Sequence, residues 1–303
     1  MTEKKRKEQI FLNGKFIDAK EPAISVFDRG LLYGDGLFET IRSYNGRPFM
    51  LKGHLERLSR GASFLGIPAS KIRGLEGKVK KLIEINGLTK KSGRIRITLT
   101  RGVDKEGYKT TGKKFNPTLI ITAVRLKHAP ILRMQKTGVS IITINPNKGF
   151  SSSGLSLDGV KSLNFLSMIM ASKYAEDKGV FEAILTNEEG HLIEGTSSNI
   201  FIFDENKLIT PPVSRSTNRH KAKGSALPGI TRETVIKIAK ENKIKVKEAN
   251  FTTKDLTNSA EAFLTNSIIE IVPINEVNEK KIFNNDNRPI TAVLQEAYKN
   301  LVI

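Results

Sequence analysis

The sequence predicts a mixed α/β fold in two domains, and three observations support that prediction. The chain has 303 residues, about two domain lengths at roughly 150 residues per domain. Hydrophobic residues make up 38% of it, an ordinary share for a globular protein with a buried core. Segments that alternate apolar and polar residues, typical of strands, are interspersed with segments of helical period. We expect a smaller N-terminal α/β domain over 1–127, a link over 128–137 and a larger C-terminal domain over 138–303.

The N-terminal domain begins with a predicted hairpin over 9–18, because Asn13-Gly14 favours a tight turn between two short strands. Alternating β-branched and aromatic residues predict the strands that follow, and apolar residues three and four apart predict the helices. In order, these elements are a strand over 36–44, helices over 52–65 and 70–86, and strands over 94–101 and 118–125.

In the C-terminal half, Pro130 and mixed polarity mark residues 128–137 as a link between domains. Two loops are expected beyond it: a glycine- and serine-rich loop at 149–160, and a long, basic loop rich in proline and serine at 211–226. The predicted helices cover 162–178, 231–242, 253–258 and 289–300. The predicted strands cover 138–144, 181–186, 191–194, 199–203, 207–210, 245–249, 261–265 and 269–274.

Composition excludes several classes of chemistry. The chain has no cysteine, which excludes disulfides, thiolate nucleophiles and cysteine-bound metal clusters and is typical of a reducing compartment. The four histidines have no metal-ligand spacing, so no metal site is predicted. No apolar run approaches the roughly 18 residues of a membrane span, and the polar, basic N-terminus does not resemble a secretory signal. We expect a soluble, cytoplasmic protein with no membrane partner.

The net charge of +19 favours the binding of anions, nucleic acid among them. The lysines are spread along the whole chain, and no nucleic-acid-binding motif accompanies them. A solvated basic surface is therefore the favoured interpretation, and no nucleic-acid partner is expected. Nucleic-acid binding remains the alternative hypothesis in which the protein is not an enzyme.

Residues 149–172 contain a single cationic residue, Lys161, although the composition of the chain predicts about four in such a window. A lysine in uncharged surroundings has a lowered pKa, so its neutral amine can act as a nucleophile or base. From this window alone, a lysine that starts a helix and extends to water is the favoured interpretation.

Three elements of the sequence could bind an anion. They are the amides of Ile230 and Thr231 at the start of a predicted helix, Asn266 and Ser267 after an apolar strand, and Arg57 on a predicted helix. Each also has an ordinary explanation, as a helix cap, a loop or a surface arginine. Together with an isolated lysine they indicate a phosphorylated ligand that condenses with an amine. Glu194 interrupts an apolar run, so it needs a partner if it is buried, or else it is exposed in a β-bend.

Six stretches, in order, resemble the fold-type IV pyridoxal-phosphate enzymes, the class that includes branched-chain and D-amino-acid aminotransferases and aminodeoxychorismate lyase. They are SVFDRGLLYGDGLFET at 25–40, HLERL at 54–58, KSLN at 161–164, EGTSSN at 194–199, LPGITRE at 227–233 and LTNSIIEI at 264–271. Any one of them is a weak signal, but six in order are a strong one.

The resemblance implies roles for the residues already singled out. Lys161 is similar to the family's Schiff-base lysine, which also moves a proton between substrate and cofactor. Glu194 is similar to the partner of the pyridine nitrogen. The residues similar to its phosphate-binding groups are Arg57, Ile230, Thr231, Asn266 and Ser267. The resemblance further implies pyridoxal 5′-phosphate bound between two domains and an active unit that is at least a homodimer.

The same resemblance gives a mixed signal about the substrate. Tyr33, Phe38 and Arg96 match the substrate pocket of the branched-chain type, and Ile268 is a further substrate-binding candidate. Arg94, however, stands where that type usually has a tyrosine. Because Arg94 and Arg96 are alternate residues of one predicted strand, they share a face. We hypothesise that one or both bind a substrate carboxylate, against the alternative of a charged face in solvent.

Two other members of the family remain as alternatives. KSLN is closer to the D-amino-acid type and the lyase, but Lys105 and Gly107 stand where the D-type has an arginine and a histidine that trap the carboxylate. Thr40 and the TNS run at 265–267 resemble the lyase, which eliminates pyruvate and gives 4-aminobenzoate. We expect an aminotransferase that acts on a hydrophobic, branched-chain L-amino acid and a 2-oxo acid such as 2-oxoglutarate.

Overall fold

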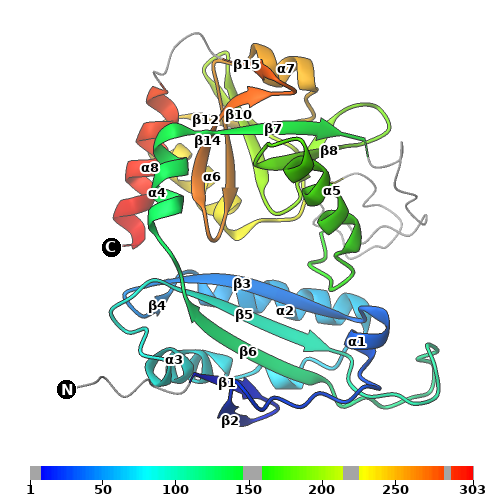
Figure 1. Ribbon diagram of the computed structural model, residues 1–303. Coiled ribbons are helices and arrows are strands. Elements are labelled where there is room, and N and C mark those ends of the chain that lie inside the picture. The colour runs from blue at the N-terminus through cyan, green and yellow to red at the C-terminus, as the bar shows by residue number, and fades with distance from the viewer. Residues whose placement is uncertain (1–7, 146–158, 214–224, 283–287, 303) are drawn as a thin grey trace. The chain divides into compact units, whose positions relative to one another are not determined.

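The computed structural model describes residues 8–145, 159–213, 225–282 and 288–302. The chain divides into two compact units (Figure 1). The first consists of Met1–Lys127 with Val160–Phe165, and the second of His128–Gly159 with Leu166–Ile303. Each unit has one β-sheet and several helices, so the predicted mixed α/β fold is confirmed. Most of the two predicted loops at 149–160 and 211–226 lies outside the described residues.

The first unit is built on a six-stranded antiparallel sheet with strand order β2-β1-β6-β5-β3-β4. Its strands are β1 (Gln9–Leu12), β2 (Lys15–Asp18), β3 (Gly36–Tyr44), β4 (Arg47–Pro48), β5 (Gly93–Thr100) and β6 (Thr118–Arg125). Its helices are α1 (Arg29–Tyr33), α2 (Leu51–Leu65), the short 3-10 helix η1 (Ser70–Ile72) and α3 (Leu75–Ile85). The predicted hairpin over 9–18 is confirmed as β1 and β2, which pair directly.

The two faces of this sheet differ in character. Alternate residues of β5, among them Ile95 and Ile97, are fully buried in the core, where α2 packs on β3 and α3 packs on β1 and β6. The intervening residues Arg94 and Arg96 are exposed on the opposite face. The predicted shared face of these two arginines is therefore confirmed, because successive side chains of a strand alternate in direction.

The prediction of one continuous helix over 70–86 is wrong. The segment is divided into η1 and α3, and Gly74 between them has φ of 70°. That left-handed conformation is open to glycine but interrupts a right-handed helix. The apolar residues before and after Gly74 keep nearly the same helical spacing, so their period does not reveal that the helix is interrupted there.

The second unit is built on a nine-stranded sheet with order β12-β11-β10-β13-β14-β7-β8-β9, in which β15 pairs with β14. Its strands are β7 (Val139–Ile144), β8 (Glu182–Thr186), β9 (Leu192–Gly195), β10 (Asn199–Asp204), β11 (Lys207–Thr210), β12 (Lys245–Glu248), β13 (Glu261–Asn266), β14 (Glu270–Val277) and β15 (Lys280–Lys281). Its helices are α4 (Ala129–Thr137), α5 (Leu166–Asp177), α6 (Ile230–Glu241), α7 (Thr253–Asn258) and α8 (Pro289–Val302). Within the described residues, no helix is long and apolar enough to cross a membrane.

Two elements of this half of the chain differ from expectation. Residues 129–137, expected as part of a link, form α4, which has Pro130 in its first turn, where proline is tolerated. The helix predicted from 162 begins only at Leu166, because the preceding residues pair with the start of β3. The amide of Phe38 donates to the carbonyl of Lys161 at 3.0 Å, and the amide of Leu163 donates to Gly36 at 2.9 Å.

Candidate functional site

Lys161 lies in the first unit, beside the start of β3. Its backbone is fixed by the bond from Phe38, and its half-buried side chain places Nζ 4.6 Å from the centre of the Phe38 ring. A cation over an aromatic face is stabilised by the ring quadrupole, and the ring also covers it from water on that side. The structure therefore gives Lys161 a defined position instead of a solvated one.

Arg96 lies against the same ring. Its guanidinium carbon is 4.0 Å from the centre of Phe38. Partial burial lowers the pKa of Arg96, and the positive charge of Arg94 lowers it further. Among the described residues neither arginine has an ion-pair partner. An anion that neutralised both would relieve their mutual repulsion.

Arg57 is buried and already paired. Glu39 on β3 accepts from Arg57 Nε at 2.8 Å and from Nη2 at 2.6 Å. His54 Nδ1 lies 2.7 Å from the same carboxylate. Burial by itself would raise the pKa of Glu39, but the charge of Arg57 and the hydrogen bonds from Arg57 and His54 lower it to about 2. Arg57 is thus held in one orientation by a buried carboxylate.

His54 completes this cluster as a neutral group. Burial lowers its pKa, and the positive charges of Arg57 and Lys161 act in the same direction against the pull of Glu39. An ionised carboxylate can only accept, so Nδ1 carries the proton and donates it to Glu39. The cluster therefore has two formal charges, one of each sign, and leaves the imidazole uncharged.

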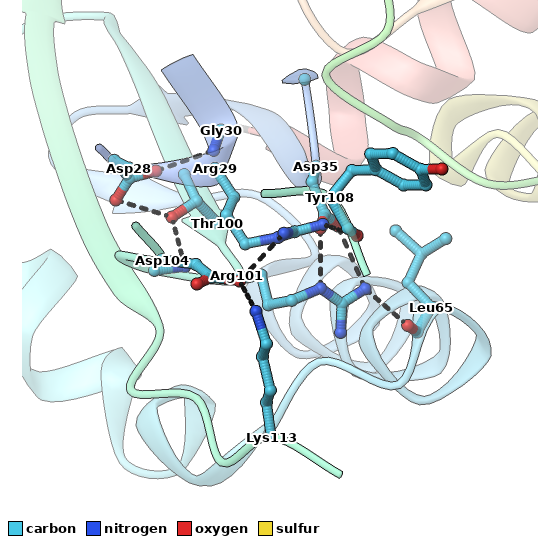
Figure 2. A network of polar contacts seen from close by, with 12 residues as sticks. Asp28, Arg29, Gly30, Asp35, Leu65, Thr100, Arg101, Asp104, Tyr108 and Lys113 are labelled. Carbon is cyan, nitrogen blue, oxygen red and sulfur yellow. Dashed lines mark hydrogen bonds and ion pairs between the residues drawn. The ribbon is translucent and has the colours of Figure 1, made fainter. Parts of the chain in front are cut away.

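Tyr33 lies at the end of α1 and is 41% exposed, with the guanidinium of Arg29 5.1 Å from its ring. Figure 2 shows the polar network around that arginine. Arg29 Nε and Arg101 Nε donate to the same oxygen of Asp35, at 2.8 and 2.7 Å. Arg29 also donates to the carbonyls of Gly107 and Tyr108, at 2.7 and 2.8 Å. The network ties α1 to the segment that follows β5.

In the second unit, the half-buried Glu194 at the end of β9 has two described contacts. It accepts from the amide of Leu227 at 2.8 Å and from Asn199 Nδ2 at 3.4 Å. Asn199 Nδ2 also donates to the carbonyl of Leu227 at 3.0 Å. The partners required for this carboxylate therefore include backbone and side-chain amide groups.

The first turn of α6 lies next to this carboxylate. Gly229 is the N-cap of α6, and no side chain among the described residues caps the helix. A Cβ at Gly229 would lie 2.0 Å from Asn199 Oδ1, so only glycine allows this close approach. The alternative that Thr231 is itself the cap is therefore wrong, because α6 begins at Ile230 and Thr231 lies inside it, buried.

The end of β13 adjoins the same place, since Thr265 is the direct partner of Asn199 across the sheet. Asn266 Oδ1 accepts from the amides of Ile268 and Ile269, at 2.8 and 2.9 Å, and so closes a tight turn. Ser267 and Ile268 lie in that turn and are half-buried. The hydroxyl of Thr265 is fully buried, and within the described part of the chain it has no hydrogen-bond partner.

The structure thus gathers the predicted residues in two groups, one in each unit. Lys161, Phe38, Arg96 and Arg57 belong to the first, whereas Glu194, the start of α6 and the end of β13 belong to the second. The second group suits a phosphorylated pyridine. It offers an uncapped helix start for a dianion, an unsatisfied buried hydroxyl and a carboxylate for a ring nitrogen.

Glu39 and Asn199 are not among the site residues predicted from the sequence. Both lie inside motifs quoted above, one in LFET and the other in EGTSSN, and both are polar residues buried within strands. A polar side chain buried in a strand is unfavourable unless it has hydrogen-bond partners. A polar residue at an apolar position of a predicted strand is therefore the sequence feature that could have identified both residues.

Comparisons with known proteins agree with this chemistry. A family model described as amino-transferase class IV matches residues 36–277. A protein of Methanocaldococcus jannaschii assigned as a branched-chain-amino-acid aminotransferase is 39% identical over 301 residues, which is 97% of this chain and 96% of that protein. A D-alanine aminotransferase of Bacillus licheniformis is 31% identical over 296 residues, 97% of each.

A solved structure agrees as well. The branched-chain aminotransferase of Thermoproteus uzoniensis, crystallised with norvaline, matches with a TM-score of 0.83 and 29% identity, over 98% of this chain and 95% of that one. The fold is that of the fold-type IV aminotransferases. The chain belongs to the class IV aminotransferase family, and the resemblance read from its six motifs is confirmed. It is a transaminase of this pyridoxal-phosphate-dependent family.

Proposed function

We propose that this chain binds pyridoxal 5′-phosphate and transfers an amino group between a branched-chain, hydrophobic L-amino acid and a 2-oxo acid such as 2-oxoglutarate. The observation that carries the proposal is the packing of Lys161 Nζ and Arg96 against one aromatic ring, Phe38. It supports the proposal because an amine and a carboxylate-binding cation are the two groups that an amino-acid substrate needs. The likeness to the M. jannaschii protein supports the choice of substrate.

Lys161 has the central role in this proposal. When bound, the cofactor supplies an electron sink for the bond that breaks at the substrate α-carbon. Lys161 Nζ would hold the cofactor and move the proton of the substrate α-carbon. The Phe38 ring limits water around that amine, so proton transfer is directed to the substrate. The carboxylate of Glu194, positioned by the Leu227 amide, would keep the pyridine nitrogen protonated.

Each unit offers candidate groups for binding a phosphate. In the second unit these are the first-turn amides of Ile230 and Thr231, with Asn266 and Ser267 nearby in the turn after β13. In the first unit Arg57, whose guanidinium is oriented by Glu39, is the candidate charged donor to a phosphate oxygen.

Arg94 and Arg96 would bind carboxylate groups of the substrates. A carboxylate that bridges them gains charge-assisted hydrogen bonds and removes their mutual repulsion. Tyr33 and Ile268 remain candidates for contact with the hydrophobic side chain of the amino acid, since each exposes part of an apolar surface.

We include a homodimer in the proposal. The first unit exposes large apolar side chains on and around α1, with Val26 65% exposed, Leu31 67% and Tyr108 72%. Apolar side chains gathered in this way on a surface are typical of protein interfaces. The absence of cysteine supports a reducing, cytoplasmic location.

The test is a donor screen by visible spectroscopy. The purified protein, loaded with pyridoxal phosphate, is mixed separately with L-leucine, L-glutamate and D-alanine, with Lys161→Ala as the control. Loss of the visible band with L-leucine and L-glutamate is the expected result. A protein that takes up no pyridoxal phosphate would refute the proposal.

D-amino-acid transamination is the second candidate, favoured by the 31% identical D-alanine aminotransferase and by KSLN at 161–164. A response to D-alanine without a response to L-leucine would favour it. Release of pyruvate from aminodeoxychorismate, without any response to amino acids, would instead favour the lyase.

A further inference from the structure

Glu182, the first residue of β8, is a buried carboxylate with an unusual set of partners. Its Oε1 accepts from Thr196 Oγ1 at 3.0 Å, from the Ser197 amide at 2.6 Å and from Ser197 Oγ at 3.1 Å. Its Oε2 accepts from Ser198 Oγ at 2.7 Å. All of these donors belong to three consecutive residues, so one side chain determines the conformation of one turn.

The turn 195–198 is packed closely against Glu182. The Gly195 amide donates to the Ser198 carbonyl at 2.8 Å, and the Thr196 amide donates to Ala183 on β8 at 3.1 Å. A Cβ at Gly195 would lie 2.7 Å from Glu182 Oε1. The carboxylate therefore fills the space beneath the turn, and the turn has no room to shift towards it.

The turn joins two residues of the candidate site. Glu194 precedes it and Asn199 follows it, and both contact the backbone of Leu227 just before α6. Any rotation of the turn would move these two side chains apart and separate them from Leu227. Because Gly229 approaches Asn199 so closely, such a movement would also disturb the start of α6.

We propose that Glu182 is a positioning residue for the cofactor: it holds the turn 195–198 so that Glu194 faces the pyridine nitrogen and the first turn of α6 faces the phosphate. The inference rests on the proposed function. Glu182 does not itself touch the cofactor, and it acts through Glu194 and Asn199.

If Glu182 only stabilised the fold, an uncharged side chain could fill the same space beneath the turn 195–198. Burial raises the pKa of Glu182, against the hydrogen bonds from Ser198, Ser197 and Thr196, and no cation among the described residues pairs with it. Burying a carboxylate without a cation is unfavourable unless its two oxygens accept hydrogen bonds that no smaller side chain could accept. The turn 195–198 directs four hydrogen-bond donors to one place, and a carboxylate can accept all four.

The experiment compares Glu182→Ala and Glu182→Gln with Glu261→Ala in the full-length protein. Glu261 is a matched control: it is buried in the same unit and accepts from the Ile290 and Thr291 amides and the Thr291 hydroxyl at the start of α8. The measurements are the dissociation constant of pyridoxal phosphate, from its visible absorbance, and the melting temperature of the protein without cofactor.

Glu182→Ala is expected to weaken cofactor binding by about tenfold or more, as the loss of a residue that orients ligand-binding groups commonly does. Glu182→Gln keeps an acceptor for the Ser197 amide and should recover most of the affinity. Glu261→Ala should lower the melting temperature and leave the dissociation constant within about twofold of wild type.

Folded Glu182→Ala protein with wild-type affinity would overturn the inference, and so would an equal loss of affinity in Glu261→Ala. If Glu182→Ala does not fold, Ser198→Ala removes one donor and should still weaken binding several-fold, whereas unchanged affinity there would count against the inference. Failure of the wild-type protein to bind pyridoxal phosphate would instead refute the proposed function.

Discussion

Replacing Glu39 by Gln should remove an acid-sensitive contribution to the stability of the first unit. The carboxylate is fully buried and accepts two hydrogen bonds from Arg57 and one from His54. The substitution leaves the Arg57 guanidinium buried without its counter-ion. Removal of one partner of a buried pair costs about 3–5 kcal/mol of unfolding free energy.

The pH dependence follows from the pKa of Glu39, which falls from 4.5 to about 2 in the folded chain. Because the folded pKa is depressed, the contribution is fully present above pH 4.5 and is lost as the pH falls towards 2. The shift corresponds to about 3 kcal/mol at 1.36 kcal/mol per unit. By the linkage relation, about 2 kcal/mol of this should be lost between pH 7 and pH 3.

The assay is urea denaturation of wild type and Glu39→Gln at several pH values from 7 to 3. The difference in unfolding free energy between the two proteins should shrink by about 2 kcal/mol across this range. Glu84→Gln is the control, because Glu84 forms an exposed pair with Lys81 that should contribute little. Parallel profiles for wild type and Glu39→Gln would refute the reasoning.

Three further substitutions test the site itself. Lys161→Ala should abolish turnover and the visible band without a change in the melting transition, and normal turnover would show that its assigned role is wrong. Arg96→Gln and Arg94→Gln should each raise KM for the amino acid by about tenfold, the equivalent of one charge-assisted hydrogen bond, and unchanged KM in both would remove their proposed role. Gly229→Ala places a Cβ 2.0 Å from Asn199 Oδ1, so cofactor affinity should fall markedly in a binding titration, and unchanged affinity would contradict the proposed contact of α6 with phosphate.

Local periodicity was sufficient to predict many of the elements. The strand over 36–44 and the helix over 52–65 were predicted almost to the residue, because their apolar residues recur over many positions. The five-residue α1 and the delayed start of α5 were not predicted. A single helical turn has too few residues to show a period, and residues 161–163 are held by pairing with β3, which no local pattern reveals.

The site was predicted in its residue types but not in its partners. The sequence predicts an anion-binding role for Arg57, and in the structure Arg57 donates to the carboxylate of Glu39, 18 residues away on another element. Arg29 binds the carbonyl of Gly107, 78 residues away. Such pairs depend on which elements pack together in the folded chain, and that information is tertiary.

A sequence signal for these clusters nevertheless exists. His54 and Arg57 lie on the same buried face of α2 as Leu55 and Leu58, and Glu39 occupies a buried position of β3 between Leu37 and Ile41. Each is a charged or titratable residue where the period of its element requires an apolar one. Such a residue must have partners, since an isolated buried charge is too unfavourable to persist. Glu182, placed directly before the buried run Ala183-Ile184, fits the same description, and that is why its hydrogen bonds to the turn 195–198 call for a functional explanation.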